Sequence, residues 1–159
     1  MIILPSRLKL IRDNFFEFSF ESEEEVVPSF EIFQSLSSAE QYILVKEYNW
    51  DDGTQVLNWI IDSEKCDRGT ATMMFWLAEP DFYFDYQTEE DIDEWARDVW
   101  RLLQRIVGRF RSNDFTSSRF GFIPTRQGYQ TDWDSATGIW ELPLSLVKGN
   151  EGLKPIALG

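Results

Sequence analysis

Residues 66–76 read Cys-Asp-Arg-Gly-Thr-Ala-Thr-Met-Met-Phe-Trp, and this stretch, CDRGTATMMFW, predicts a central helix of the fold. Asp67 is a residue type that accepts backbone amide hydrogen bonds at a helix N-terminus, so we expect the helix to begin directly after it. Gly69 would allow another segment of backbone to come close. Met74 and Phe75 supply apolar packing, and Pro80 ends the helix soon afterwards. The stretch therefore predicts a packed helix whose first turn lies against another part of the chain.

A second acidic stretch, Tyr-Asn-Trp-Asp-Asp-Gly at residues 48–53, precedes apolar residues that recur at helical spacing over 56–61. We expect Asp51 or Asp52 to cap a helix that begins there. A calcium loop would need further oxygen ligands and a downstream glutamate, which the following residues do not supply. The sequence therefore favours helix caps over a metal or catalytic site at these aspartates.

Two further helices are predicted from their N-terminal signals. Ser37 and Glu40 form a capping-box pattern before a helix over about 38–48. Thr88 precedes the longest predicted helix, about 89–109. Its apolar face is predicted to consist of Ile92, Trp95, Ala96, Val99, Leu102, Leu103, Ile106 and Val107.

The two ends of the chain have weaker patterns. Phe16, Phe18 and Phe20 alternate with polar residues, which is typical of a half-buried strand. Short extended pieces are expected around 120–123 and 139–142, where glycine, proline and aromatic residues are frequent.

These elements predict an α+β fold in a single domain over residues 1–159. The centre is mainly helical, with four helices over about 38–109, and short strands lie near the N- and C-termini. An all-α fold is the alternative. Whether the two ends pair into one sheet is left open by the sequence.

Two absences in the composition narrow the chemistry. The chain of 159 residues contains no histidine and only one cysteine, Cys66. The lack of histidine excludes catalytic triads and metal sites that use histidine. A single cysteine excludes a zinc site made of several thiolates. Cys66 is expected to be an inert small hydrophobic residue, because the sequence fixes no base beside it. For an enzyme, carboxylate chemistry, the single cysteine, or an arrangement of serine, lysine and tyrosine remains open. Our prediction is nevertheless a protein with no catalytic residue, no metal and no cofactor.

No secretory signal is expected at the N-terminus, where Pro5, Arg7, Lys9 and Arg12 interrupt the apolar residues. No run of apolar residues approaches the length that crosses a bilayer. These features predict a cytoplasmic protein that does not associate with a membrane.

The formal net charge is -13, and it is unevenly distributed. Residues 67–96 contain nine acidic residues and one basic residue, a net charge of -8. Phosphate binding needs lysine and arginine, so a nucleic acid is not an expected partner, whereas a basic protein surface is. Four arginines follow at helical spacing and are expected to pair with acids of the same chain such as Asp93 and Asp98, with a phosphate-binding stripe as the alternative. These arginines are Arg97, Arg101, Arg105 and Arg109.

Asn-Trp-Asp-Asp-Gly at 49–53, Cys-Asp-Arg-Gly-Thr-Ala at 66–71 and Phe-Trp-Leu-Ala at 75–78 resemble the signature of a small bacterial domain of unknown function. The resemblance covers about residues 40–80 and implies a bacterial, helical protein. Domains of this kind are similar in size and acidity to the immunity proteins of contact-dependent and type VI toxin systems.

The best candidate for function is the stretch from Glu79 to Trp95, EPDFYFDYQTEEDIDEW, in which acidic and aromatic residues alternate without a basic residue. Aromatic residues are typical anchors of protein interfaces, and acidic residues steer a basic partner. An ordinary loop with inward aromatics and solvated acids is the competing interpretation. The predicted partner-binding residues are Asp81, Tyr83, Asp85, Tyr86, Glu89, Glu90, Asp93 and Glu94.

The leading hypothesis is an immunity protein, a monomer that blocks a cognate basic toxin or effector protein in a 1:1 complex. A nuclease, whose cleft normally receives phosphate, would suit such an acidic surface. One alternative is a hydrolase that uses paired carboxylates from 81–94 or 51–52. Another is an adaptor or structural subunit of a larger assembly.

Overall fold

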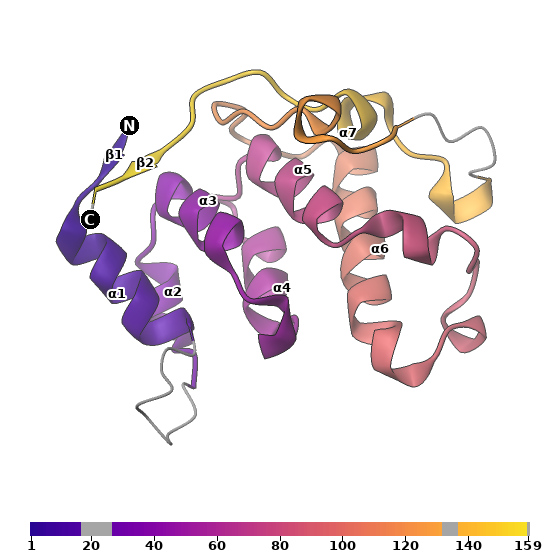
Figure 1. The fold of residues 1–159 in the computed structure, drawn as a ribbon, viewed down its shortest axis with the longest axis horizontal. Helices are drawn as coiled ribbons and strands as arrows, with labels where there is room; N and C mark the ends of the chain where they lie inside the picture. The colour runs from indigo at the N-terminus through magenta and orange to yellow at the C-terminus, as the bar shows by residue number, and fades with distance from the viewer. Residues whose placement is uncertain (17–26, 132–136, 159) are drawn as a thin grey trace.

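The computed structural model describes residues 1–16, 27–131 and 137–158, which form seven α-helices and two short strands. Figure 1 shows the helices side by side, with the C-terminal segment crossing above them. The α-helices are α1 (Pro5–Phe15), α2 (Phe30–Gln34), α3 (Ser38–Glu47), α4 (Gln55–Asp62), α5 (Arg68–Leu77), α6 (Arg97–Ser112) and α7 (Leu144–Lys148). The strands are β1 (Ile2–Ile3) and β2 (Ile156–Ala157).

The centre of the fold is formed by α3 and α5, which pack against each other. Every residue of α3 over 39–45 is buried, as is every residue of α5 over 69–76. A helix that is buried on all sides lies inside a protein rather than on its surface. The prediction of a helical centre is thus confirmed, and α4 and α6 complete the four helices expected there.

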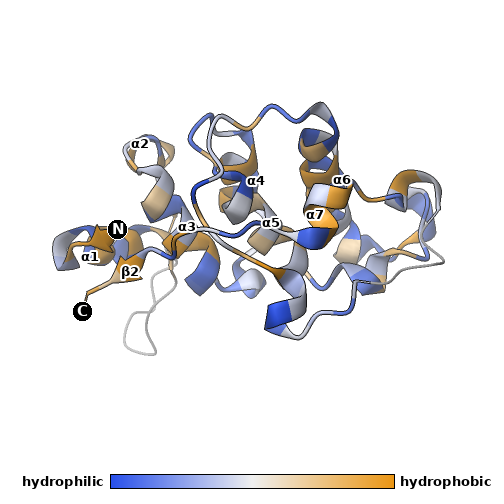
Figure 2. Ribbon diagram, turned by 90° about the horizontal axis from the view of Figure 1, so that it is seen from above, coloured by the Kyte–Doolittle hydropathy of each residue, from blue (hydrophilic) through white to orange (hydrophobic). Residues whose placement is uncertain are grey.

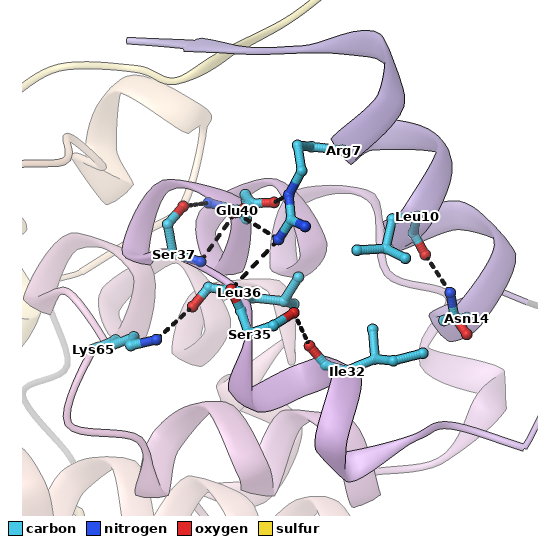
Figure 3. Close-up of polar contacts among 9 residues, drawn as sticks. All are labelled: Arg7, Leu10, Asn14, Ile32, Ser35, Leu36, Ser37, Glu40 and Lys65. Atoms are coloured by element: carbon cyan, nitrogen blue, oxygen red, sulfur yellow. Dashed lines mark hydrogen bonds and ion pairs between the residues drawn. The ribbon is translucent and has the colours of Figure 1, made fainter.

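Glu40 links α3 to α1 through a partly buried ion pair with Arg7. The predicted capping box is present, because the Ser37 hydroxyl accepts from the Glu40 amide and the Glu40 carboxylate accepts from the Ser37 amide, both at 3.1 Å. The same carboxylate accepts from Nε of Arg7 at 2.7 Å (Figure 3). Burial opposes the charge of Glu40, but the hydrogen bonds from Arg7 and Ser37 outweigh it and lower the pKa.

The expected aspartate caps at residues 51 and 52 are wrong. Asp51 and Asp52 lie in a 3-10 turn, Trp50–Asp52, and the side chain of Asn49 accepts the cap hydrogen bond from the Asp51 amide at 3.0 Å. Helix α4 begins at Gln55, two residues later than a helix that directly follows Asp52, with Thr54 at its N-cap. The turn forms because Gly53 adopts a positive φ of 88°, which ends one helical segment before the next begins.

The longest helix begins at Arg97 and not at Glu89. Residues Glu89–Asp91 and Glu94–Ala96 form separate 3-10 turns, and Ile92 between them is extended and 2% exposed. The Thr88 hydroxyl donates to the Asp91 carboxylate at 2.8 Å rather than capping a helix. Burying Ile92 in an extended conformation prevents α6 from starting earlier.

The ends of the chain differ from the predicted strands. Residues 5–15 form α1, because Leu8, Ile11 and Phe15 lie on one helical face and are buried. The expected alternation at Phe18 and Phe20 lies outside the described residues. Around 120–123 there are isolated bridges, from Phe120 to Leu153 and from Phe122 to Asn150, instead of a strand.

The other expected strand, 139–142, is also wrong. Gly138–Trp140 is a 3-10 turn, which places the Trp140 ring in the core at 0% exposure. Figure 2 shows hydrophilic and hydrophobic residues interleaved along α1 and α6, as expected for helices that bury one face against the core.

The C-terminal segment returns to the N-terminus, where β1 and β2 pair in parallel (Figure 1). Ile2 pairs with Ile156, and Ile3 pairs with Ala157. The two ends therefore do meet in one small sheet, and the molecule is mostly helical. Within the described part of the chain, no helix has both the length and the apolar character needed to cross a membrane.

Candidate interaction surface

The segment from Glu79 to Ala96 connects α5 to α6 and contains three 3-10 turns, the first of which is Pro80–Tyr83. Helix α5 ends because Glu79 adopts a left-handed conformation, with φ 56° and ψ 65°. The residue before a proline is disfavoured in the helical region, so Pro80 sets this ending. The segment then passes alongside α6 (Figure 1). Some of its side chains, such as Tyr83 and Ile92, are buried in the core, and others are exposed to solvent.

The inward side chains attach this segment to the core. Tyr83 is 6% exposed, and burial raises the pKa of its hydroxyl, to which the charge of Glu79 adds. The Phe84 ring meets Trp140 edge to face, with centroids 5.1 Å apart. The carbonyl oxygen of Tyr86 accepts from Nε1 of Trp100 at 3.2 Å and from Nε1 of Trp140 at 2.8 Å. These contacts fix the backbone of the segment.

Two aromatic rings face outward, and we call Phe82 and Trp95 the ring pair. Phe82 is 45% exposed and Trp95 is 74% exposed. Their ring centroids are 5.8 Å apart, with an angle of 37° between the planes. Trp95 was expected on the apolar face of a helix, and that expectation is wrong because residues 94–96 form a 3-10 turn outside the register of α6. The solvent-facing aromatic surface is therefore the ring pair and not Tyr83.

Exposed carboxylates accompany the ring pair along the chain. Among the described residues, none of these acids forms an ion pair, and the undescribed segments contain no lysine or arginine. The surface therefore has negative charge that is not neutralised within the chain. These acids are Asp81, Asp85, Glu90, Asp93 and Glu94.

Glu89 differs from its acidic neighbours. Its carboxylate is half-buried and accepts from Nε of Arg101 at 2.9 Å. This hydrogen bond is the main reason that the pKa of Glu89 is lowered, although desolvation acts in the opposite direction. Glu89 is thus paired with an arginine of the same chain at the surface, where it holds a 3-10 turn against α6.

The arginines of α6 bind groups of the same chain, as predicted. Arg101 also contacts Asp98, and Arg105 forms an ion pair with Asp62. Arg97 donates to the carbonyl oxygen of Ile92 at 3.3 Å. Arg109, whose side chain is 13% exposed, forms an ion pair with Asp114. These contacts confirm the expected pairing with acids of the same chain for Arg101, Arg105 and Arg109, with Asp98 as one of the expected acids. The expectation is wrong for Asp93, which forms no ion pair with a described residue, and for Arg97, which binds a backbone carbonyl instead of an acid.

The loop 115–120 is attached to the start of α5 through Asp67, which is fully buried. Asp67 caps α5, as predicted, by accepting from the Gly69 amide at 2.8 Å. Its carboxylate also accepts from the Ser117 hydroxyl at 2.5 Å and from the amides of Arg119 and Phe120 at 2.7 and 3.2 Å. Asp67 therefore joins two segments that are distant in the sequence.

Three surface clefts formed by described residues are lined by residues other than Asp51, Asp52 and the acids of 81–94. One cleft of about 630 Å³ lies between α2 and α4 and is lined by Phe30, Phe33 and Trp59. Cys66 is fully buried, and burial raises the pKa of its thiol to about 12. The exposed acids of 81–94 thus lie on the outer surface of the molecule and do not line any of these three clefts.

Comparison with known proteins gives one match. The model of a domain of unknown function, DUF4274, matches residues 37–111, somewhat less than half of the chain. The matched range extends from the capping box of α3 almost to the end of α6, and it contains both the Asp67 cap and the ring pair. No curated protein and no solved structure matches this chain.

Proposed function

We propose that this protein is an acidic protein-binding module, and specifically a bacterial immunity protein that neutralises a cognate secreted toxin by direct binding. The observation that carries the proposal is the ring pair, Phe82 and Trp95, which is exposed among acids that form no ion pair with a described residue. An exposed aromatic surface of this kind is suited to burial by a partner.

The chemistry of the surface defines the partner. Unneutralised carboxylates attract a basic surface and accelerate its association, while the aromatic rings provide contact area once water is displaced. A toxin that acts on nucleic acid has a basic cleft for phosphate, and carboxylates can occupy that cleft in place of phosphates. The partner is thus a basic toxin or effector protein, bound by a cytoplasmic monomer in a 1:1 complex.

The direct experiment is co-expression with the product of the adjacent reading frame. Cells that make the neighbouring protein alone should stop growing, and co-expression of this protein should restore growth. The purified pair should then form a 1:1 complex in size-exclusion chromatography. A neighbour that is not toxic, or one that this protein does not bind, would exclude the immunity function.

A charge-reversal variant tests whether the proposed surface makes the contact. Replacing Asp85, Glu90 and Glu94 with lysine should slow association and weaken binding by about tenfold or more at low salt. The matched control replaces Glu31, Asp51 and Glu64, which are equally exposed on other elements and change the net charge by the same amount. If the control weakens binding as much, only the overall charge of the molecule matters and the surface is elsewhere.

The same experiments address the alternatives. An adaptor or structural subunit would form a stable complex with a neighbour that is not toxic. A carboxylate-dependent hydrolase needs two carboxyl groups facing each other across a pocket, and no observation on the described residues favours that arrangement for the acids of 81–94 or 51–52.

A further inference from the structure

The molecule contains one arginine that is held by an acid and an aromatic ring from adjacent residues. Nε of Arg109 donates to Oδ1 of Asp114 at 3.0 Å. The guanidinium carbon of the same arginine lies 4.6 Å from the centroid of the Phe115 ring. An acid followed directly by an aromatic residue therefore supplies both a charged acceptor and a ring face for one guanidinium group.

The ring pair repeats this sequence pattern twice, without a cation. Asp81 directly precedes Phe82, and Glu94 directly precedes Trp95. Both acids are exposed, and no described lysine or arginine forms an ion pair with either of them. The surface thus presents the same two components that hold Arg109, with both of them accessible from solvent.

The nearest arginines along the chain are already bound elsewhere. Arg97 donates to the carbonyl oxygen of Ile92, and Arg101 binds Glu89. Trp95 is 74% exposed, so one face of its indole is open to a group from another molecule. A cation for this position must therefore come from outside the chain.

We infer that the ring pair receives an arginine side chain of the partner, with the guanidinium group stacked on Trp95 and hydrogen-bonded to the Glu94 or Asp81 carboxylate. This inference rests on the proposed function, because it specifies the contact that the partner makes. Arginine is preferred to lysine, since its planar and weakly hydrated guanidinium group can stack on a ring and donate to a carboxylate at the same time. A lysine ammonium group is strongly hydrated and cannot stack in this way.

The test uses the full chain and short peptides with blocked ends, tri-arginine and tri-lysine. The indole N–H signal of Trp95 is followed by NMR during titration and is assigned with the Trp95→Phe variant. Tri-arginine should shift this signal and bind more tightly than tri-lysine of the same charge, by about threefold or more. Equal affinity for the two peptides, or a Trp95 signal that does not move, would overturn the inference.

Two variants separate stacking from simple attraction. Trp95→Ala should remove the preference for arginine and leave the weaker binding that both peptides share, and Glu94→Gln should reduce binding of tri-arginine by about twofold or more. Phe30→Ala is the matched control, because Phe30 is a 50% exposed aromatic residue on α2. Retention of the arginine preference in Trp95→Ala would also overturn the inference. The signals of the other tryptophans report whether each variant is folded.

The outcomes for the two proposals are distinguishable. If a basic partner is captured but tri-arginine is not preferred, the proposed function stands and the arginine contact is wrong. If tri-arginine is preferred at Trp95 but the neighbouring protein is not bound, the immunity function is wrong and the chain carries an arginine site of another use. Once the partner is known, each arginine in its interface can be changed to lysine. At one position this change should weaken binding to the native protein but not to the Trp95→Ala variant.

Discussion

The carbonyl group of Phe120 lies so close to Gly69 that a Cβ atom at residue 69 would be 2.6 Å from the carbonyl carbon of Phe120. The first turn of α5 and the loop 115–120 therefore touch through their backbones. The sequence predicted that some other backbone would approach Gly69, and the structure identifies it as the segment that Asp67 holds.

Gly69→Ala should destabilise the protein by about 2 kcal/mol or more, because an added methyl group overlaps a backbone that is fixed by hydrogen bonds. Urea denaturation measures the change. Gly108→Ala is the control, since it lies within α6 with open space around its Cα, and it should increase the free energy of unfolding by about 0.5 kcal/mol or more. Equal effects of the two changes would mean that the contact with Phe120 is not close.

Asp67→Asn should reduce the free energy of unfolding by about 3 kcal/mol. The carboxylate accepts four hydrogen bonds with two oxygens, and an amide replaces one oxygen by a donor that faces other donors. A simple cap such as Asn49, which accepts one bond from an exposed turn, should lose only about 1 kcal/mol on change to alanine. The free energies of unfolding of both variants, measured by heat and by urea, will show whether Asp67, which joins two segments, contributes more than Asn49, which caps a single turn.

Glu40→Gln should destabilise the protein at neutral pH by about 2 kcal/mol, because the carboxylate accepts from Arg7 and from the Ser37 amide. The pKa of Glu40 is lowered in the folded state. Its contribution is therefore complete above the ordinary pKa of 4.5 and is lost as the pH falls through the lower folded-state value. The stability difference between the native protein and the variant should be constant above about pH 5.5 and shrink below about pH 4.5. A difference that grows in acid would contradict this sign.

Trp95→Ala should change the free energy of unfolding by less than about 0.5 kcal/mol, because the side chain is 74% exposed. Trp140→Ala should cost about 3 kcal/mol or more, because that ring is fully buried and packs against Phe84 and Trp100. Denaturation curves for the two variants compare a surface tryptophan with a core tryptophan. A large loss for Trp95→Ala would mean that the ring pair serves the fold rather than a partner.

The four central helices could be predicted because their signals are local. Ser37 with Glu40, and Asp67 alone, are caps that lie within one turn of the groups they bind. Helix α1 also has a local signal, with Leu8, Ile11 and Phe15 on one face, but the charged residues between them obscured it. In contrast, the partners of Asp67 at residues 117–120 are too distant in sequence to be read from a pattern.

Amino-acid composition located the region of the candidate surface, but it did not identify which aromatic residues are exposed there. The excess of acids over 67–96 is visible in the sequence, and five of the predicted acids are exposed without an ion pair among the described residues. Trp95 was misplaced because the sequence prediction began the long helix before Ile92. In the structure Ile92 has an extended backbone, so the helical spacing of α6 does not continue back to Trp95. Tyr83 was chosen for its residue type, although only the tertiary structure determines which aromatic ring faces solvent.

The parallel pairing of Ile2 with Ile156 places both chain termini at one end of the molecule's long axis, and the segment from 79 to 96 lies toward the opposite end (Figure 1). A tag or a fused domain on either terminus would therefore project away from the ring pair. Protein immobilised through a terminus would present Phe82 and Trp95 outward, so a sensor surface or a display particle prepared in this way keeps the candidate surface accessible to a partner in solution.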